Sequence, residues 1–328
     1  MPDIFDKGIF VLVCVLVLAG IGNAVVLHPD GEPEADFSDI DIPDTNVIGR
    51  WGSNASCVAI GRNLIITTIH QDSYNADTFR PVNIAGRYYT PSQVWTTSLS
   101  DDIRIVKLNH ADLEAYSDIY TNQNEPGLNM VQGGYGKSRD VSLDYGYTWK
   151  SESNTTLRFC SNKVENTGTQ SYKIYADFDE LGVGDATEFE GIAAAYDSGS
   201  GWFIKSNGEW KLAAITYGVT RKGESWFDDP DTSGTNPDYM TGWRISKFAS
   251  WIDSVVNEQP DCDYVETDLN DDCVIDIYDL VEFAYQWASQ TCGISNNYCE
   301  GADINQDTNV DLADFADIAE DWLADYTE

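Results

Sequence analysis

Short apolar segments divided by turn residues fill the chain from Val47 onward, and they restrict its fold more than any other feature. Each is shorter than the run that a buried helix needs, and Gly, Asn or Asp residues bound it, as is typical of β-strands. Asn207-Gly208 separates two of them and predicts a tight hairpin. The pattern predicts an all-β barrel or sandwich. The expected strands lie within residues 56–61, 63–69, 80–86, 103–108, 129–136, 171–178, 201–206 and 210–218.

One helix is expected to close this region, over residues 243–256. Apolar residues there are spaced so that they would share one helical face. They are Trp243, Ile245, Phe248, Ile252 and Val255. The polar stretch 257–261 then predicts a linker, so the strand-rich domain covers residues 45–256 and a smaller domain covers residues 262–328.

The N-terminal residues 1–24 predict a secretory signal peptide. Lys7 precedes the apolar run 9–20, and small residues ending at Ala24 offer a cleavage site. The run is too short to span a membrane comfortably, so we expect no membrane span in the mature chain. Residues 25–44 are acidic and contain three Pro, which predicts an extended leader. These features predict a secreted, extracellular protein.

The formal net charge of -36 excludes a nucleic-acid backbone as a natural partner. It suits a soluble secreted protein or a saline habitat. The charge is uneven, because residues 260–328 carry 19 Asp and Glu and no Lys or Arg. Such a block is often a disordered tail. Here apolar residues at regular spacing favour a folded domain instead.

Six cysteines remain once the signal peptide, with Cys14, is removed. In an exported protein they are expected to pair. The two in the strand-rich domain, Cys57 and Cys160, form either a disulfide or two buried free thiols, and both alternatives stay open. The four in the acidic domain allow three connectivities. They are Cys262, Cys273, Cys292 and Cys299.

The acidic domain contains an internal repeat, in which Asp268 aligns with Asp303 and Trp287 with Trp322, an offset of 35 residues. Each unit places oxygen-bearing side chains at positions 1, 3, 5, 9 and 12 of a loop, before a helical pattern. This is the ligand spacing of an EF-hand calcium loop, in which the position 7 carbonyl also binds the ion. The expected ligands are Asp268, Asn270, Asp272, Val274, Asp276 and Asp279 in the first loop, and Asp303, Asn305, Asp307, Asn309, Asp311 and Asp314 in the second.

Residues 262–326 resemble a type I dockerin, which has two calcium loop–helix units without entering helices and Asp at position 12. The resemblance implies a small α-helical, EF-hand-like domain with two bound Ca²⁺ ions. It also implies a cohesin-type or cell-surface docking partner. Position 6, where the pattern has Gly, is Cys273 in one loop and Thr308 in the other. A non-Gly residue at positive φ costs about 1 kcal/mol, so we expect weaker calcium affinity than a glycine loop would give.

Three strings carry the parts of a nucleophilic serine site. They are TTIHQD with His70, SDDIRIVKL with Asp102 and AYDSGSGW with Ser198. A serine hydroxyl is unreactive until a His takes its proton, and a carboxylate holds that His in one tautomer. The chain has only three His, and the order His, Asp, Ser is one of the three that serine hydrolases use.

These strings resemble the catalytic motifs of the trypsin/chymotrypsin family of serine peptidases, over roughly residues 45–256. NLIITTIHQ is similar to the strand before that family's TAAH motif, DDIRIVKL to DIALLKL, and YDSGSG to GDSGGP. The alignment selects Asp102 over Asp101 and Ser198 over Ser200. The resemblance implies a double β-barrel closed by a C-terminal helix, and peptide hydrolysis without a cofactor.

The resemblance also implies roles for individual residues. His70 would act as general base and then general acid, while Asp102 orients it. The backbone N–H groups of Ser198 and Tyr196 would form the oxyanion hole, although the family has Gly where Tyr196 stands. Ile192 would form the floor of the specificity pocket, which favours an apolar substrate side chain over Lys or Arg. The residues expected in the pocket wall are Thr216, Tyr217 and Gly218.

We therefore expect a secreted serine endopeptidase carrying a calcium-binding docking module. The alternative from another functional class is an inactive barrel that serves as a binding or scaffold protein. An esterase with the same triad is disfavoured, because no GxSxG elbow surrounds Ser198. Labelling of Ser198 by a fluorophosphonate separates the first two alternatives.

Overall fold

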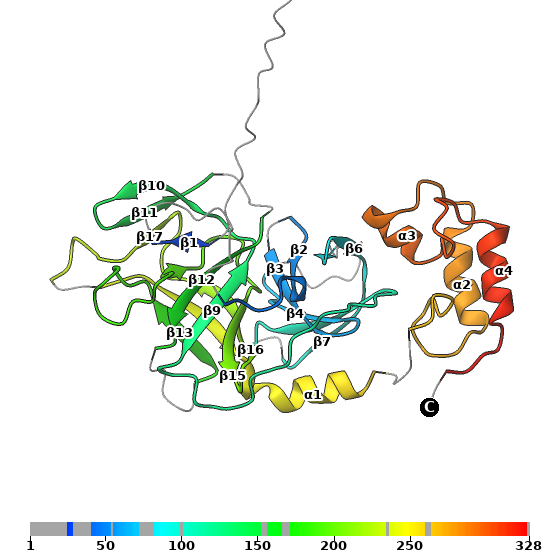
Figure 1. Ribbon diagram of the computed structural model, residues 1–328, viewed down its shortest axis with the longest axis horizontal. Coiled ribbons are helices and arrows are strands. Elements are labelled where there is room, and N and C mark those ends of the chain that lie inside the picture. Colours follow the sequence, from blue (N-terminus) through cyan, green and yellow to red (C-terminus); the bar gives the residue numbers. More distant parts are fainter. Residues whose placement is uncertain are drawn as a thin grey trace, which may run out of the picture.

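The chain folds into two curled antiparallel β-sheets and a few short helices (Figure 1). This confirms the expected mostly-β class with two half-barrels. The structure is a computed structural model. The described residues are 25–28, 41–53, 55–71, 82–98, 101–151, 156–165, 171–233, 236–259 and 264–326. The predicted signal peptide, most of the predicted leader and the end of the predicted linker lie outside them.

The first half-barrel is a seven-stranded sheet in the order β6-β5-β2-β3-β4-β8-β7. Its central strands are almost wholly buried, because they are apolar on both faces and pack against a core on each side. The strands are β2 (Ile48–Trp51), β3 (Ala55–Gly61), β4 (Leu64–Thr67), β5 (Val82–Ile84), β6 (Arg87–Tyr89), β7 (Pro91–Thr96) and β8 (Arg104–Leu108). A short 3₁₀ helix, η2 (Thr45–Val47), leads into the first of them.

The second half-barrel is a six-stranded sheet in the order β12-β9-β15-β16-β18-β13. Asn207 and Gly208 form the predicted hairpin turn between β15 and β16, with φ of 54° and 89°. Both values are positive, as a type I′ turn requires. The strands are β9 (Asn129–Gly134), β12 (Arg158–Lys163), β13 (Lys173–Asp177), β15 (Gly201–Ser206), β16 (Glu209–Val219) and β18 (Tyr239–Arg244).

Two smaller sheets cover one end of the second half-barrel. One joins β10 (Arg139–Leu143), β11 (Gly146–Trp149) and β17 (Glu224–Trp226). The other pairs β1 (Val26–Leu27) with β14 (Gly191–Ile192). Because Val26 is fully buried in the core of the second half-barrel, the fold includes residues that precede the expected domain boundary at 45.

The apolar residues of the two half-barrels meet in a shared core. Val58 and Ile105 come from the first sheet, and Phe203 and Ile215 come from the second, and all belong to one buried cluster. Each half-barrel also has a core of its own. The shared core fixes the two sheets relative to each other and therefore fixes the loops that meet between them.

The closing helix is shorter than the sequence indicates. Residues 243–244 end strand β18, a 3₁₀ turn η4 (Ile245–Lys247) follows, and the helix α1 (Ala249–Asn257) begins only at residue 249. The expectation that Trp243 lies on a helix was wrong, because Trp243 is paired with Ile215 and Lys173 across the sheet. The spacing of Trp243 from the next apolar residues suits a strand between two neighbouring strands as well as it suits a helix.

The C-terminal domain contains α2 (Ile277–Gln286), η5 (Ile294–Asn296), α3 (Asn297–Glu300) and α4 (Leu312–Glu320). α2 and α4 begin in the same way, with Asp276 and Asp311 as N-caps in capping boxes completed by Asp279 and Asp314. Within the described residues, no helix is long and apolar enough to cross a membrane.

Cysteine chemistry differs between the two domains. Cys57 and Cys160 are buried free thiols, so the alternative of a disulfide between them is wrong. In the C-terminal domain, Cys292 and Cys299 form a disulfide with an S–S distance of 2.05 Å. Cys273 is disulfide-bonded as well. Burial raises the pKa of both free thiols, which keeps them protonated and unreactive.

Candidate active site

Strand pairing brings His70 and Asp102 together. His70 lies just beyond the end of β4, and Asp102 lies just before β8. β4 and β8 are antiparallel neighbours, with Thr67 opposite Arg104. The end of one strand and the start of the other therefore meet at the same edge of the first sheet. This placement explains why two residues 32 positions apart share one site.

The three side chains form a continuous hydrogen-bonded chain. His70 Nδ1 contacts Asp102 Oδ2, and His70 Nε2 lies 2.8 Å from Ser198 Oγ. The other oxygen of Asp102 accepts the backbone N–H groups of Ile69 and His70, at 2.8 and 2.7 Å. Gln71 places its side-chain nitrogen 2.9 Å from His70 Nε2, so it competes with Ser198 for that ring nitrogen. Apart from this competitor, the arrangement matches a nucleophile, a base and an orienting carboxylate.

The loop that carries Ser198 joins the two half-barrels. The Ser56 N–H, on β3, donates to the Ser198 carbonyl at 2.9 Å, and the Gly199 N–H donates to the Thr216 carbonyl on β16 at 2.9 Å. Gly199 has a φ of 81°, and a Cβ there would lie 2.2 Å from the Ser56 carbonyl oxygen. Only glycine fits this close approach, which holds the serine between the sheets.

Ser200 lies in a different environment from Ser198. Its side chain is fully buried, and its hydroxyl is 2.6 Å from Thr216 Oγ1 and accepts Gln132 Nε2 at 2.9 Å. Ser198 is partly exposed and faces His70. The structure therefore brings Ser198, and not Ser200, into contact with the His70 imidazole.

Tyr196 adopts the backbone conformation that glycine would favour at this position. Its φ is 80°, in the left-handed region that costs an L-residue roughly 1–2 kcal/mol. Among the described residues, no group accepts the backbone N–H of Tyr196 or of Ser198. Both N–H groups are thus free to bind an oxygen. The Tyr196 ring lies beside Lys137, whose Nζ is 5.5 Å from the ring centroid.

The residues expected in a specificity pocket are divided between core and surface. Ile192 is buried in the second core, opposite Val26 of β1. Thr216 is also buried, and its hydroxyl accepts Trp202 Nε1 at 2.8 Å. Tyr217 is 41% exposed, and its ring meets the His70 ring edge-on at 5.9 Å. A Cβ on Gly218 would meet nothing within 4 Å, so this wall faces open space.

Two carboxyl groups in the segment before Ser198, those of Glu190 and Asp197, are buried. Asp197 is fully buried and accepts the N–H groups of Gly136 and Ala194, while Glu190 accepts both donors of Thr187. Burial raises the pKa of Asp197 to about 7 and that of Glu190 to about 8. An acidic residue beside an apolar segment is too common a pattern to single out Glu190, whereas Asp197 stands in the YDSGSG string that indicated Ser198.

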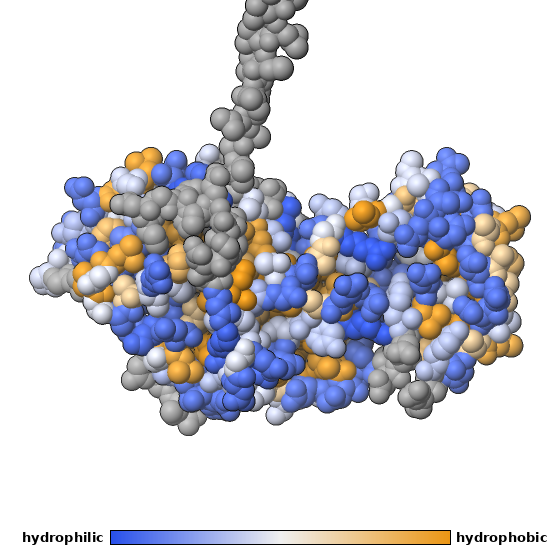
Figure 2. All heavy atoms as spheres, in the orientation of Figure 1, coloured by the Kyte–Doolittle hydropathy of each residue, from blue (hydrophilic) through white to orange (hydrophobic). Residues whose placement is uncertain are grey.

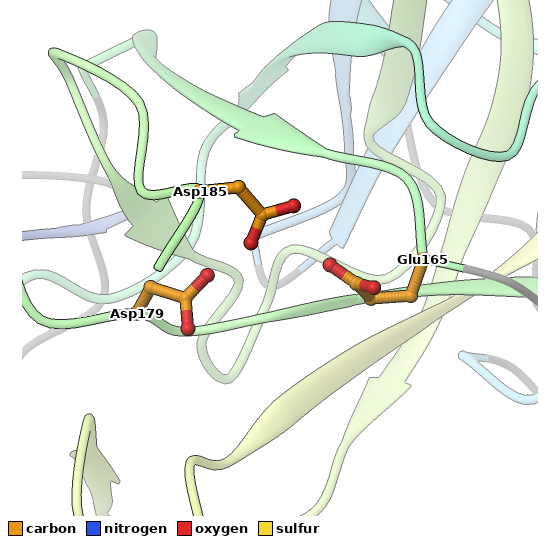
Figure 3. Close-up of side chains that lie close together, drawn as sticks. All are labelled: Glu165, Asp179 and Asp185. Atoms are coloured by element: carbon orange, nitrogen blue, oxygen red, sulfur yellow. The ribbon is translucent and has the colours of Figure 1, made fainter. Parts of the chain in front are cut away.

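Three further carboxylates gather on the second half-barrel. Glu165, Asp179 and Asp185 bring one oxygen each within 4.8 Å of one another, and no other trio of His, Cys, Asp or Glu side chains in the described part of the chain is this close (Figure 3). Lys163 pairs with Asp185 at 2.8 Å. Burial, with the neighbouring Asp185 carboxylate, raises the pKa of Asp179 to about 6. The trio is an acidic cluster that Lys163 partly neutralises.

The two repeated loops of the C-terminal domain have the same internal hydrogen bonds. Asp268 accepts the N–H groups of Asp272 and Cys273, and Asp303 accepts those of Asp307 and Thr308, all at 2.8–3.1 Å. The other position 3, 5 and 12 side chains accept equivalent backbone N–H groups of their own loops. These side chains are Asn270, Asp272 and Asp279 in the first loop, and Asn305, Asp307 and Asp314 in the second.

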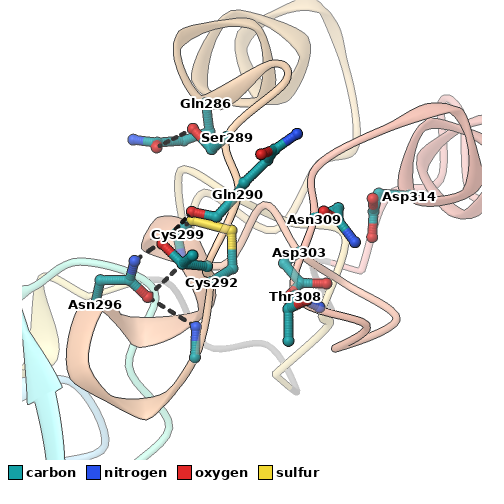
Figure 4. The surroundings of a disulfide bond; sticks show 12 residues. Gln286, Ser289, Gln290, Cys292, Asn296, Cys299, Asp303, Thr308, Asn309 and Asp314 are labelled. Carbon is teal, nitrogen blue, oxygen red and sulfur yellow. Dashed lines mark hydrogen bonds between the residues drawn. A yellow bond between two sulfur atoms is a disulfide. The ribbon is translucent and has the colours of Figure 1, made fainter.

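Position 6 of each loop adopts the turn that a glycine would make. The φ values are 72° at Cys273 and 83° at Thr308. The sharp turn is therefore made without glycine, at the cost of backbone strain. Figure 4 shows the second loop beside the Cys292–Cys299 disulfide, with Asp303, Asn309 and Asp314 turned toward one another. The oxygen donors of each loop suit a hard cation such as Ca²⁺.

Taken together, the described residues contain two places with organised chemistry, one around Ser198 and one in the paired acidic loops. Sequence patterns indicated both, but not Gln71, whose only signal was its place beside His70. No protein-family model matches the sequence, and no curated protein does.

Proposed function

We propose that the chain is a secreted serine endopeptidase with a trypsin-like double barrel, joined to a calcium-binding dockerin-like module. The observation that carries the catalytic part is the 2.8 Å contact between His70 Nε2 and Ser198 Oγ, with His70 Nδ1 held by Asp102. The three residues of this hydrogen-bonded series come from three separate loops. The two half-barrel sheets around it support the same reading.

The proposed reaction begins when Ser198 Oγ attacks the carbonyl carbon of the scissile peptide and His70 Nε2 takes the hydroxyl proton. The Asp102 carboxylate stabilises the imidazolium that forms. The N–H groups of Tyr196 and Ser198 bind the oxyanion, and a missing donor of this kind costs about 10²–10³ in turnover. His70 then protonates the leaving amine, and water releases the acyl group by the same steps in reverse roles.

The test of the catalytic part compares the mature chain with two variants, Ser198→Ala and Ser200→Ala. A fluorophosphonate should label the wild type and Ser200→Ala, and Ser198→Ala should stay unlabelled and fail to hydrolyse peptides. Ser200 is a matched control because it is a serine in the same loop that points into the core. Equal labelling of Ser198→Ala and wild type would refute the assignment, and absence of labelling in all three would favour an inactive barrel.

We propose that each acidic loop holds one Ca²⁺ ion through the side chains at positions 1, 3, 5, 9 and 12 and the carbonyl at position 7. The residues fit this role, because hard oxygens are the ligands calcium prefers and the two loops share one internal geometry. Asp279 and Asp314 are fully buried at position 12. A bound cation would offset the mutual repulsion of these carboxylates.

Exposed apolar side chains on the helices of the module support a docking role. The exposed fractions reach 57% at Ile277, 78% at Tyr285 and 71% at Leu312. Figure 2 shows hydrophobic side chains along the outer edge of the module. Exposed apolar surface of this kind marks a site of protein association. We therefore propose a protein partner of the cohesin type for this face.

Calorimetry tests the calcium proposal. The full chain should bind two Ca²⁺ ions, and Asp268→Ala and Asp303→Ala should each lose one of them. Glu320→Ala, which removes a carboxylate outside both loops, is the control and should keep both. A chain that gives no calcium heat, with helix content unchanged by chelator, would contradict the proposal without touching the catalytic one.

A further inference from the structure

The first acidic loop packs directly against the first half-barrel, at His110. The His110 side chain is 5% exposed, and its Nδ1 lies 3.1 Å from the Asp268 carbonyl oxygen. Its Nε2 lies 2.7 Å from the hydroxyl of Tyr264, at the start of the module. A buried polar ring with both nitrogens bonded to the module shows an interface that is specific in geometry.

Asp271 is the second element of this contact. Its carboxylate accepts the His110 backbone N–H at 3.1 Å and lies 3.8 Å from Lys107 Nζ, and its carbonyl accepts Lys107 Nζ at 3.3 Å. The side chain of Asp271 is 7% exposed. It stands at position 4 of its loop, which supplies no ligand in the calcium pattern. Its carboxylate is therefore available to the barrel while its neighbours face into the loop.

The internal repeat provides a comparison within the same chain. Position 4 of the second loop is Gln306, which has the same φ of 56° as Asp271. Within the described residues, no hydrogen bond or ion pair joins the second loop to the barrel. The two loops are thus matched in internal geometry and differ in whether the barrel holds them.

A second segment of the module, residues 297–300 (the strip), completes the interface. Asn297 donates to the His110 carbonyl at 3.2 Å, and Glu300 accepts Thr90 Oγ1 at 2.7 Å. Arg87 lies over the Tyr298 ring, 5.0 Å from its centroid. These residues lie beside the Cys292–Cys299 disulfide, which holds the strip as a unit. The module is therefore bound to the barrel through both its first loop and this strip.

We propose that Ca²⁺ binding in the first loop and the contact between that loop and the barrel are coupled. Bound Ca²⁺ stabilises the contact at His110, and the contact raises the affinity of the first loop for Ca²⁺. The inference rests on the proposed calcium sites. Asp268 supplies a ligand through its side chain and bonds His110 through its carbonyl, so ion and barrel fix the same backbone. Two partners that favour the same conformation bind cooperatively, and each must strengthen the other by the same factor.

The test measures Ca²⁺ affinity of the full chain by calorimetry, with Ser198→Ala present to prevent self-cleavage. An Asp303→Ala background isolates the first loop, and an Asp268→Ala background isolates the second. Asp271→Gln gives the first loop the residue of its counterpart, and Lys107→Gln breaks the same contact from the barrel side. Both variants should lower the Ca²⁺ affinity of the first loop by about fivefold or more and leave the Ca²⁺ affinity of the second loop unchanged.

The two variants change the local charge in opposite directions, which separates coupling from a simple field effect. Removal of a negative charge would weaken Ca²⁺ binding, but removal of the Lys107 charge would strengthen it. Opposite shifts would therefore overturn the inference. Hydrogen exchange provides a second readout, because Ca²⁺ should slow exchange of the His110 amide in the wild type and not in Asp271→Gln. If the protein binds two Ca²⁺ ions but the variants change neither the Ca²⁺ affinity nor the hydrogen exchange of the His110 amide, only the proposed coupling is overturned. If the protein binds no Ca²⁺, both the coupling and the proposed calcium sites are overturned.

Discussion

Gly199→Ala should destabilise the fold by an amount that can be derived from its surroundings. A Cβ at this position would lie 2.2 Å from the Ser56 carbonyl oxygen and 2.4 Å from Thr67 Oγ1, both within the first sheet. Overpacking of this kind costs about 1–3 kcal/mol. The φ of 81° adds about 1–2 kcal/mol for any L side chain. We therefore expect a loss of about 2–5 kcal/mol in unfolding free energy.

Gly208→Ala is the matched control. Gly208 has a φ of 89°, but a Cβ there would meet nothing within 4 Å. It should cost only the backbone strain of about 1–2 kcal/mol. The effect of alanine on the unfolded chain is the same for both variants and cancels in their difference. Urea unfolding of the two proteins measures that difference, which should be about 1–3 kcal/mol.

Serine reactivity gives this prediction a second readout. Because Gly199 follows Ser198 and fixes it against β3, Gly199→Ala should also slow labelling of Ser198 by a fluorophosphonate, and Gly208→Ala should not. Equal losses of stability in the two variants, with equal labelling, would refute the idea that close contact between the sheets positions the serine.

Three further predictions concern stability and specificity. Glu125→Ala should cost about 3–5 kcal/mol in urea unfolding, because it leaves Arg244 fully buried without its carboxylate; a loss below about 1 kcal/mol would contradict this. With calcium chelated, the melting temperature should fall as pH rises from about 4 to 8. The reason is that the pKa values of Glu190 and Asp197 are raised, so the folded state binds more protons than the unfolded state in this range. A melting temperature that rises over that window would contradict this prediction. A peptide library should show preference for apolar residues before the scissile bond, because Ile192, Thr216, Tyr217 and Gly218 carry no carboxylate that could pair with Arg or Lys; a profile dominated by Arg and Lys would exclude that assignment.

Local patterns made much of the fold predictable from the sequence. Strands with apolar residues and turn signals are encoded in short segments, and the Asn207-Gly208 hairpin needs only its two residues. Trp243 shows the limit, because its spacing suits a helix and only pairing with Ile215 and Lys173 decides for a strand. Likewise, nothing within residues 25–28 indicates that Val26 pairs with Ile192 far along the chain.

The candidate sites show the same contrast between local sequence patterns and contacts between distant segments. His70, Asp102 and Ser198 were indicated by their motifs, and the repeat indicated the loop residues. Contacts made across large distances in sequence were not indicated, such as the bond between His110 and Asp268, 158 positions apart. The repeat itself contains one signal, because Asp271 is an extra carboxylate where the second loop has Gln306.

The proposed activity depends most on Ser198 acting as a nucleophile that His70 activates. Labelling of the full-length mature chain with a fluorophosphonate, followed by mass mapping of the modified peptide, tests this directly. We expect a single adduct on Ser198, which His70→Ala should lose while its circular dichroism spectrum shows that the fold persists. A wild-type protein that is folded yet takes no label at Ser198, or that is labelled equally well in His70→Ala, would contradict it.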